Sequence, residues 1–215
     1  MTAVIFDCDG TLVDSEPLAR TAWERALAPH GYAVTEADLD GSVGLPYARV
    51  HAYFAERVAL PDAPAFWPGL ADELFRLIDS ELVVFPDAVG SARELHARGF
   101  PVAVASSSPR ERLDRTLRRA GLLDAFDVTV AGDEVERGKP EPDMFLAAAA
   151  RLGAEPGECV VIEDSPPGVA AGVAAGMATL AICRVPGTEA SLAAADAVLD
   201  VLSADAIMAA APVRS

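Results

Sequence analysis

The chain has 215 residues, of which 52% are hydrophobic and 23% charged, enough for one globular domain or a core domain with a small insert. Its formal net charge of −16 argues against nucleic acid and anionic membranes as partners, because both would repel it. The three cysteines form no closely spaced pair, so neither a disulfide framework nor a zinc site is expected.

The first residues, MTAVIFDCDG, carry acids where a secretion signal needs basic residues, and no run of 18 apolar residues occurs. We therefore expect a cytoplasmic protein without a membrane span. A monomer is the expected state, with a dimer left open. The negative charge does not exclude an anionic substrate, since a local basic pocket can exist within an acidic surface.

Short apolar runs predict strands at residues 3–7, 101–105, 127–131, 159–163, 178–182 and, more weakly, 197–201. Helical patterns lie between the later runs, at residues 87–98, 109–120, 142–152 and 165–175, and each stops at a glycine. Strands that alternate with helices predict an α/β fold with a parallel, doubly wound sheet.

Residues 14–85 interrupt this alternation. Helical patterns cover about residues 16–30, 46–59 and 66–80, and no convincing strand lies among them. The sequence therefore predicts two parts, a core formed by residues 1–13 and 86–215 and a helical insert formed by residues 14–85.

Ligands of an open parallel sheet bind beyond the C-terminal ends of its strands, so the segments there are the candidate site. Four of them are polar or acidic: Asp7–Thr11, Ser106–Ser108, Gly132–Lys139 and Glu163–Ser165. Any loop would be polar, but these four sets of side chains suit one reaction.

Asp7 and Asp9 follow the first predicted strand, and two carboxylates so close would repel each other without a nearby cation. Mg²⁺ suits such a place, because it takes oxygen ligands from one or two carboxylates, a phosphate and water. Asp164 could complete the metal site, with Glu163 in support. The alternatives are a surface turn at Asp7–Thr11 and a helix-capping role for Asp164, which the neighbouring Ser165 can fill instead.

Ser106 and Ser107 precede a predicted helix, where hydroxyl and amide groups bind phosphate oxygens well. Lys139 is the only lysine beside 16 arginines, and a compact ammonium could offset the charge of a phosphate and of crowded carboxylates. The set fits phosphoryl transfer. Asp7 would attack phosphorus and form an aspartyl-phosphate, and Asp9 would protonate the leaving oxygen and then activate water.

At these residues the chain resembles the haloacid dehalogenase superfamily, in its phosphatase and phosphomutase branch. The resemblance covers nearly the whole chain and rests on four motifs in the family's order: Val4–Glu16, Val104–Ser107, Arg137–Pro140 and Ile162–Ser165. The start of the chain and residues 79–82 are also similar to bacterial sugar-phosphate phosphatases.

The resemblance implies a Rossmann-like core and a mobile helical cap over residues 14–85, which would close over the site. It makes Asp7 the nucleophile and Asp9 the acid and base, whose backbone oxygen also binds Mg²⁺. It makes Asp164 a metal ligand.

In the cap, the resemblance places a substrate-recognition loop around Gly44, with Arg49 as a candidate contact for the substrate. His51 and Arg76 are further candidates for the distal polar groups of the substrate.

Close relatives fit less well. Dehalogenases of this superfamily lack the second acid of the first motif, here Asp9, and phosphonoacetaldehyde hydrolases need a cap lysine that this cap does not have. β-Phosphoglucomutases carry a cap histidine and a cap arginine, where this chain has Ala19 and Tyr47. We therefore predict a phosphatase of a small phosphorylated metabolite, with a sugar phosphate as the first candidate and a phosphomutase as the alternative.

Other classes are remote. An inactive binding protein would be expected to have lost Asp7, Asp9, Lys139 or Asp164. A cysteine-based phosphatase needs an arginine six residues after the cysteine, and no cysteine here has one. The segment before Lys139 does not have the spacing of a nucleotide-binding P-loop.

Overall fold

The computed structural model describes residues 2–40 and 47–211. The chain divides into two compact units, which we call the core (Met1–Asp14 and Val83–Ser215) and the cap (Ser15–Leu82). Gly44, the expected centre of the substrate-recognition loop, lies outside the described residues.

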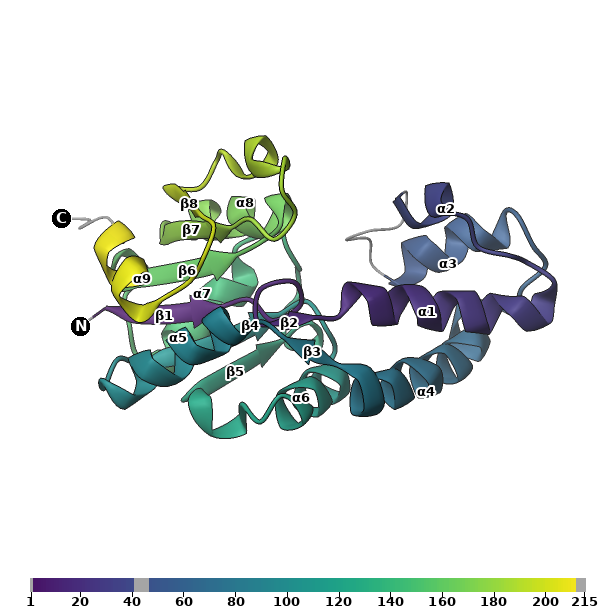
Figure 1. Ribbon diagram of the computed structural model, residues 1–215, viewed down its shortest axis with the longest axis horizontal. Coiled ribbons are helices and arrows are strands. Elements are labelled where there is room, and N and C mark those ends of the chain that lie inside the picture. The colour runs from purple at the N-terminus through teal and green to yellow at the C-terminus, as the bar shows by residue number, and fades with distance from the viewer. Residues whose placement is uncertain (1, 41–46, 212–215) are drawn as a thin grey trace. The chain divides into compact units, whose positions relative to one another are not determined.

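The core contains one six-stranded sheet in the order β5-β4-β1-β6-β7-β8, and all of its strand pairs are parallel. The strands are β1 (Ala3–Phe6), β4 (Val102–Ser106), β5 (Val128–Ala131), β6 (Cys159–Glu163), β7 (Ala178–Ile182) and β8 (Ala197–Leu199). The predicted strands and the doubly wound parallel sheet are thus confirmed. β1 occupies a central position, so the residues that follow it emerge in the middle of the sheet edge (Figure 1).

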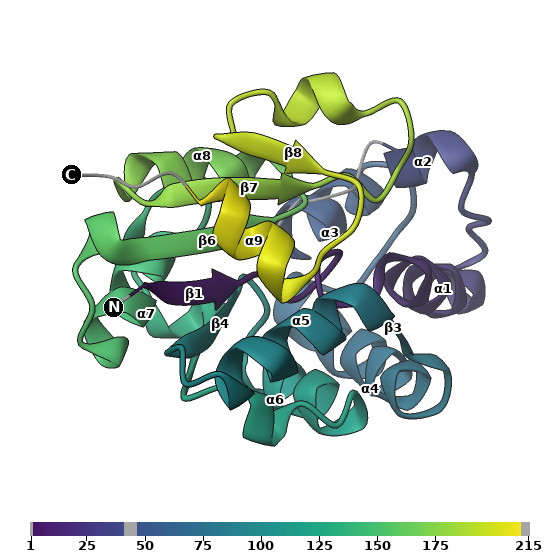
Figure 2. The same ribbon diagram turned by 60° about the vertical axis from the view of Figure 1, so that its left-hand side comes forward.

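Helices cover both faces of this sheet. α5 (Pro86–Ala97), α6 (Arg110–Arg119) and α9 (Ala204–Ala210) lie on one face, and α7 (Asp143–Leu152) and α8 (Pro166–Ala174) lie on the other (Figure 2). Because both faces are covered, the central strands are apolar along their whole length instead of alternating. On the α7 side, Met144 and Phe145 pack against Ile5, Ala103 and Val161.

Four 3-10 turns complete the core, at Leu123–Ala125, Gly132–Glu134, Pro156–Glu158 and Glu189–Leu192. α9 is a helix that the sequence analysis did not predict. It begins at Ser203, whose hydroxyl accepts a hydrogen bond from the amide of Ala206 at 3.0 Å. Its seven residues are too few for a helical period to stand out.

A second, two-stranded sheet joins the ends of the core segments. β2 (Val13–Asp14) pairs antiparallel with β3 (Val83–Val84), and Val13 lies opposite Val84. The expectation that residues 14–85 contain no strand was therefore wrong. Two-residue strands leave no periodic signal, and this pair returns Val83–Phe85 to the core rather than to the insert.

The cap is helical, as expected from its sequence. It contains α1 (Glu16–Leu27), a 3-10 turn at Ala28–His30, α2 (Glu36–Asp40), α3 (Tyr47–Ala55) and α4 (Ala63–Glu81). α4 begins three residues before the predicted helix, because the Asp62 side chain caps it by accepting from the amide of Ala65 at 3.0 Å. None of the helices within the described ranges is long and apolar enough to cross a membrane.

Aromatic rings form the centre of the cap. Trp23 stacks on Phe66 with ring centroids 5.8 Å apart, and it lies 5.3 Å from the ring of Phe54. Both tryptophans of the chain, Trp23 and Trp67, belong to the cap, so tryptophan fluorescence reports on this unit.

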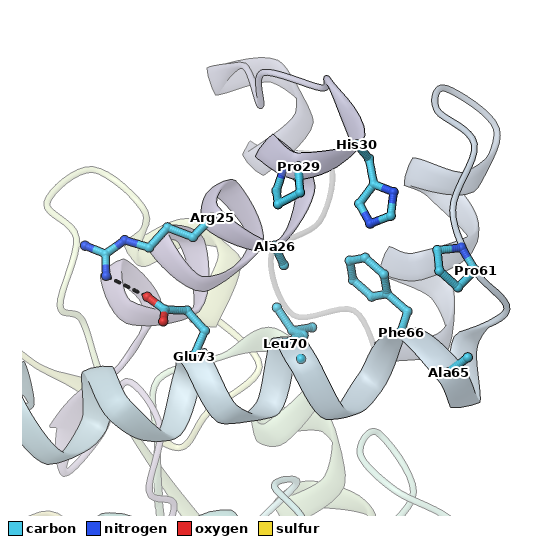
Figure 3. Close-up of a pocket in the computed structure, with 10 residues that line it drawn as sticks. Arg25, Ala26, Pro29, His30, Pro61, Ala65, Phe66, Leu70 and Glu73 are labelled. Carbon is cyan, nitrogen blue, oxygen red and sulfur yellow. Dashed lines mark hydrogen bonds and ion pairs between the residues drawn. The ribbon is translucent and has the colours of Figure 1, made fainter.

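A pocket of about 410 Å³ lies between α1 and α4 of the cap (Figure 3). Its wall is largely apolar and includes Phe66 and Leu70. Its two charged side chains, Arg25 and Glu73, bind each other at 2.6 Å and so offer little unpaired charge to a ligand. None of the site residues predicted from the sequence lines it.

Asp38 of α2 is the polar anchor of the cap. Its carboxylate accepts hydrogen bonds from the Thr35 amide at 2.9 Å, the Thr35 hydroxyl at 2.7 Å and the hydroxyls of Tyr32 and Tyr53. The bonds from Thr35, joined by those from the two tyrosines, lower the pKa of Asp38 from 3.8 to about 2 despite its burial.

We expect Asp38→Asn to destabilise the cap at pH 7 by about 2 kcal/mol, because the amide accepts fewer of these bonds. The folded-state pKa of Asp38 lies below its ordinary value, so its stabilisation is complete above about pH 4 and is lost toward pH 2. Urea unfolding followed by tryptophan fluorescence should therefore show a smaller difference between variant and wild type at pH 3 than at pH 7. Asp72→Asn, at an exposed position of the cap, is the control, and an equal difference at both pH values would contradict this account.

Candidate active site

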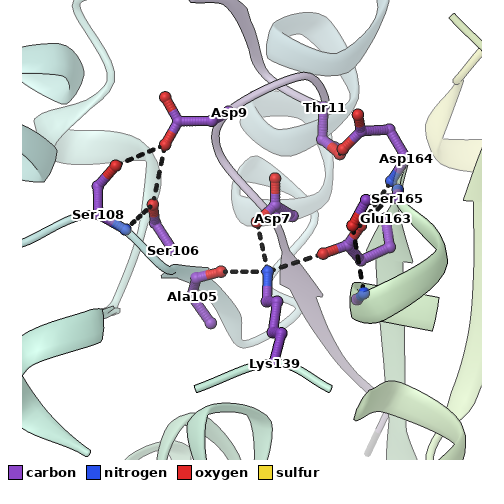
Figure 4. A network of polar contacts seen from close by, with 11 residues as sticks. Asp7, Asp9, Thr11, Ala105, Ser106, Ser108, Lys139, Glu163, Asp164 and Ser165 are labelled. Carbon is purple, nitrogen blue, oxygen red and sulfur yellow. Dashed lines mark hydrogen bonds and ion pairs between the residues drawn. The ribbon is translucent and has the colours of Figure 1, made fainter. Parts of the chain in front are cut away.

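Lys139 lies at the centre of a buried cluster of charged side chains at the C-terminal edge of the sheet (Figure 4). Its amine donates to Asp7 Oδ1, to Glu163 Oε1 at 2.7 Å and to the backbone oxygen of Ala105 at 3.3 Å. The side chain is 7% exposed. Burial disfavours the charged amine, but Asp7 and Glu163 outweigh this effect and raise the pKa of Lys139, so it stays a cation.

Asp7 follows β1 directly, and its carboxyl group is buried beside Lys139. Burial raises the pKa of Asp7 well above its usual range, and the charges of Glu163 and Asp164 add to this rise, while Lys139 opposes it. A carboxylate that has lost most of its water and has one cationic partner is a poorly solvated anion. A further cation beside it would favour the ionised form, which is the form that can act as a nucleophile.

Asp9 is held by three side chains, one from β4, one from the loop after β4 and one from α6. Its Oδ2 accepts from the hydroxyls of Ser106 at 3.1 Å and Ser108 at 2.8 Å, and its Oδ1 accepts from Arg112 Nη2 at 2.9 Å. The Ser108 amide in turn donates to the Ser106 oxygen at 3.1 Å, which leaves the Ser106 proton for Asp9. These bonds direct the Asp9 side chain toward β4 and α6, away from Lys139 (Figure 4).

The turn between Asp9 and Val13 places Asp164 next to the nucleophile. The hydroxyl of Thr11 donates to Asp164 Oδ1 at 3.0 Å. Gly10 has a φ of +90°, and a Cβ at this position would lie 2.1 Å from Asp164 Oδ2, so only glycine fits. Burial, followed by the charge of Glu163, raises the pKa of Asp164 to about 7.

Glu163 is fully engaged by the protein. Its Oε1 binds Lys139, and its Oε2 accepts from the amides of Asp164 and Ser165 at 2.8 Å and from the Ser165 hydroxyl at 2.9 Å. A Cβ at Gly168 would lie 1.7 Å from this carboxylate, so the glycine makes room for it. This arrangement favours a supporting role, in which Glu163 holds Lys139 and the start of α8.

The composition of the cluster fits Mg²⁺. It contains four carboxyl groups and two basic side chains, namely Asp7, Asp9, Glu163, Asp164, Lys139 and Arg112. This excess of acid over base, with oxygen as the available donor, suits a hard divalent cation. Among the described residues no three His, Cys, Asp or Glu side chains converge on one point. Mg²⁺ does not need three, because substrate phosphate and water complete its shell. Asp7 and Asp164, with the Asp9 backbone oxygen, would hold it.

The structure brings together most of the residues predicted for the core. Asp7, Asp9, Ser106, Lys139 and the Glu163–Asp164 pair all meet at one edge of the sheet (Figure 4). Ser107 differs, because its side chain is exposed and its backbone oxygen packs against Gly132 instead.

Three participants were not singled out in the sequence, namely Thr11, Ser108 and Arg112. Thr11 and Ser108 lie inside the quoted segments, so the segments themselves were the available signal. Arg112 is one of five arginines on α6, and nothing in the sequence distinguishes it from the other four.

The cap residues predicted to contact substrate have different surroundings. Arg49 is exposed on α3, whereas Arg76 binds Glu73 on its own helix at 2.7 Å. His51 is 7% exposed, and its Nε2 lies 3.0 Å from the backbone oxygen of Pro61, so it belongs to the interior of the cap.

Cys8, between the two acids, is buried, and burial, with the charges of Asp9 and Asp7, raises the pKa of its thiol well above its usual range. A protonated, buried thiol is a poor nucleophile, in agreement with the exclusion of a cysteine-based phosphatase.

Comparison with known proteins shows which family the chain is similar to. The model of the haloacid dehalogenase-like hydrolases matches residues 1–176. Among curated proteins, the chain is 38% identical over 180 residues to the phosphorylated carbohydrates phosphatase of Thermotoga maritima, covering 82% of each chain. It also matches two Arabidopsis thaliana proteins, SUPPRESSOR OF QUENCHING 1 and a bifunctional riboflavin kinase/FMN phosphatase, but spans only 18% and 53% of their lengths.

Solved structures share the same architecture. A haloacid dehalogenase family hydrolase from Deinococcus radiodurans, with bound phosphate and sodium, is 34% identical with a TM-score of 0.73, over 98% of this chain and 94% of that one. A candidate beta-phosphoglucomutase from Thermotoga maritima is 30% identical with a TM-score of 0.80, over 97% of both chains.

Proposed function

The chain belongs to the haloacid dehalogenase-like hydrolase family, and on that premise we propose that it is a Mg²⁺-dependent phosphatase of a small phosphorylated metabolite. The first candidate for the substrate is a sugar phosphate. The observation that carries the proposal is the meeting of Asp7, Asp9, Lys139 and Asp164 at one sheet edge, each already bound to a partner that fixes it.

The residues divide the reaction between them. Asp7 attacks the phosphorus atom in line, which forms an aspartyl-phosphate and breaks the bond to the leaving oxygen. Asp9, once it turns from Ser106 and Ser108, gives that oxygen a proton and then takes one from the water that hydrolyses the intermediate. Lys139 keeps Asp7 oriented and offsets negative charge beside it.

When bound, Mg²⁺ would supply positive charge for the phosphoryl oxygens and for Asp7 and Asp164. Phosphoryl transfer depends mostly on such positioning and electrostatic stabilisation. Glu163 contributes indirectly, because it also accepts a hydrogen bond from the Lys139 amine and so helps to fix it beside Asp7.

A sugar phosphate is favoured by the relatives. The Thermotoga protein is named for phosphorylated carbohydrates, and Escherichia coli relatives that are 34% and 35% identical are named hexitol phosphatase A and fructose-1-phosphate phosphatase. Polyol and sugar monophosphates are therefore the compounds to test first.

A phosphomutase is the second candidate, because the candidate beta-phosphoglucomutase from Thermotoga maritima aligns over nearly the whole chain. The two reactions differ in the acceptor of the phosphoryl group, which is water in one and a sugar hydroxyl in the other. Ala19 and Tyr47 in the cap, in place of the expected histidine and arginine, favour water.

The test is a panel of hexitol, hexose and pentose phosphates, phosphoglycolate, nucleotides and p-nitrophenyl phosphate, each with Mg²⁺ and with EDTA. We expect phosphate release that needs Mg²⁺ and is fastest with a sugar or polyol phosphate. Isomer formation without phosphate release, in the presence of a sugar bisphosphate, would favour the mutase instead. Absence of metal-dependent turnover on the whole panel would contradict both candidates.

A further inference from the structure

Arg184, two residues after β7, connects two distant segments of the core. Its Nη1 donates to Asp87 Oδ2 at 2.9 Å, and its Nη2 donates to the backbone oxygen of Thr11 at 2.9 Å. The guanidinium carbon lies 4.0 Å from the centroid of the Phe85 ring. The side chain is 16% exposed, so this is a largely buried arrangement.

Both segments have a defined place in the fold. Thr11 belongs to the turn that follows the nucleophile, and its hydroxyl binds Asp164. Phe85 and Asp87 mark the start of α5, just after the chain re-enters the core at Val83. Asp87 is itself fixed, because its Oδ2 also accepts from the amide of Leu202 at 3.0 Å.

The bond to Thr11 restrains a side chain that contacts the proposed metal site. The Thr11 carbonyl has one hydrogen bond from Arg184, whose planar fork is anchored at the other end by Asp87. Restraining this peptide plane also restrains the direction of the Thr11 hydroxyl, and the hydroxyl orients Asp164. Hydrogen-bond partners of this kind tune the affinity of a metal site from outside its ligand shell.

Packing alone explains Arg184 poorly. Its Nε is buried and makes no hydrogen bond to any described residue, which is an unfavourable feature of a buried guanidinium. Buried ion pairs can often be replaced by apolar residues without loss of stability. The hydrogen bond to the Thr11 carbonyl, in the turn beside the nucleophile, suggests that this arginine also serves the active site.

We propose that Arg184 is a positioning residue, which holds the turn after Asp7 so that Thr11 keeps Asp164 oriented for Mg²⁺. The inference rests on the proposed function in one respect, since it takes Asp164 as a Mg²⁺ ligand. Among the described residues, Arg184 contacts Asp87, Thr11 and Phe85 and none of the carboxyl groups of Asp7, Asp9 or Asp164.

The test compares the full-length wild type with Arg184→Met, Arg184→Lys and the double variant Arg184→Met/Asp87→Asn. Mg²⁺ dissociation constants are measured by calorimetry without substrate, and kcat is measured at saturating Mg²⁺. Arg151→Met is the matched control, because Arg151 also binds one carboxylate and one backbone oxygen. Its Nη1 donates to the Glu134 carboxylate at 2.7 Å and to the backbone oxygen of Thr129 in β5 at 2.9 Å.

We expect Arg184→Met and the double variant to weaken Mg²⁺ binding roughly tenfold, as is common for residues outside a ligand shell. Arg184→Lys should recover only part of this loss, because one ammonium cannot span both partners. Arg151→Met should stay within about twofold of the wild type. If Arg184→Met folds poorly, the double variant, which leaves no unpaired Asp87 charge, is compared with the wild type in its place.

Arg184 variants that lower only the melting temperature, with Mg²⁺ affinity and kcat unchanged, would overturn the inference. A wild type that binds Mg²⁺ but turns over no phosphate ester would remove the proposed function, while the Mg²⁺ affinities would still test Arg184. A wild type that binds no Mg²⁺ would remove both.

Discussion

Asp7→Asn is expected to abolish Mg²⁺-dependent phosphate release, with a loss on the order of 10⁴-fold or more, because the amide cannot attack phosphorus. The fold should survive the change. Asp7 is a buried acid whose pKa is raised by burial, so removing its charge relieves a desolvation cost, and Lys139 keeps Glu163 as a partner.

Loss of Mg²⁺ binding could also inactivate this variant, so the comparison needs a second carboxylate. Asp164→Asn makes the same chemical change at a side chain that we assign to the metal alone. Higher Mg²⁺ concentrations should restore part of the activity of Asp164→Asn and none of that of Asp7→Asn.

The covalent step has a direct readout. After a short incubation with labelled substrate and an acid quench, the wild type should carry an acyl phosphate that hydroxylamine releases, and Asp7→Asn should carry none. A labelled Asp7→Asn protein, or one with wild-type turnover, would contradict the assignment of the nucleophile.

Lys139→Met is expected to destabilise the core by about 3–5 kcal/mol at neutral pH, the usual cost of removing one partner from a buried ion pair. Two buried carboxyl groups, Asp7 and Glu163, would then share a site without their cation. Activity should fall together with stability, because the same amine orients the nucleophile.

The pH dependence of this variant follows from the sign of the Asp7 shift. The folded-state pKa of Asp7 lies above its unfolded value, so the folded protein binds more protons and becomes more stable as the pH falls. Without Lys139 this rise should be larger, and the stability difference between Lys139→Met and the wild type should shrink from pH 8 to pH 5. Urea unfolding followed by far-UV circular dichroism would measure it.

Lys139→Arg is the matched variant, since it keeps the charge but replaces the compact ammonium with a larger planar group. In the wild type, the Lys139 amine lies 4.9 Å from the centroid of the Phe145 ring, which leaves little room for a larger group. We expect it to keep more stability than Lys139→Met yet little activity. If the stability difference between Lys139→Met and the wild type grew toward acidic pH, it would contradict the proposed role of Lys139 as a counter-ion.

The parts of this molecule that the sequence predicts well are those with strong local signals. β1 and β6 are uninterrupted apolar runs because both faces of the sheet are covered, and the acids that follow them stand out against that background. The order of the four polar segments then suffices to place Asp7, Lys139 and Asp164 at one edge.

Other features depend on contacts between distant residues and leave no local pattern. Ser106 was expected to face phosphate, yet its hydroxyl donates to Asp9, which only the register of β4 against β1 determines. Arg112 and Arg184 resemble any other arginine in the sequence, and their partners are many residues away. His51 had the chemistry of a substrate contact, but three-dimensional packing places it inside the cap.

The pairing of β2 with β3 has a consequence for how such a protein can diversify. Val13 and Val84 lie opposite each other in the paired strands β2 and β3, so the whole segment between them is attached to the core as one long loop that is closed at its base. Loop-closure entropy grows only slowly with loop length, so a longer, shorter or altogether different inserted segment costs the core little stability once β2 and β3 are paired. New substrate preferences could thus arise by exchanging the segment between these two residues, while the reactive edge of the sheet stays as it is.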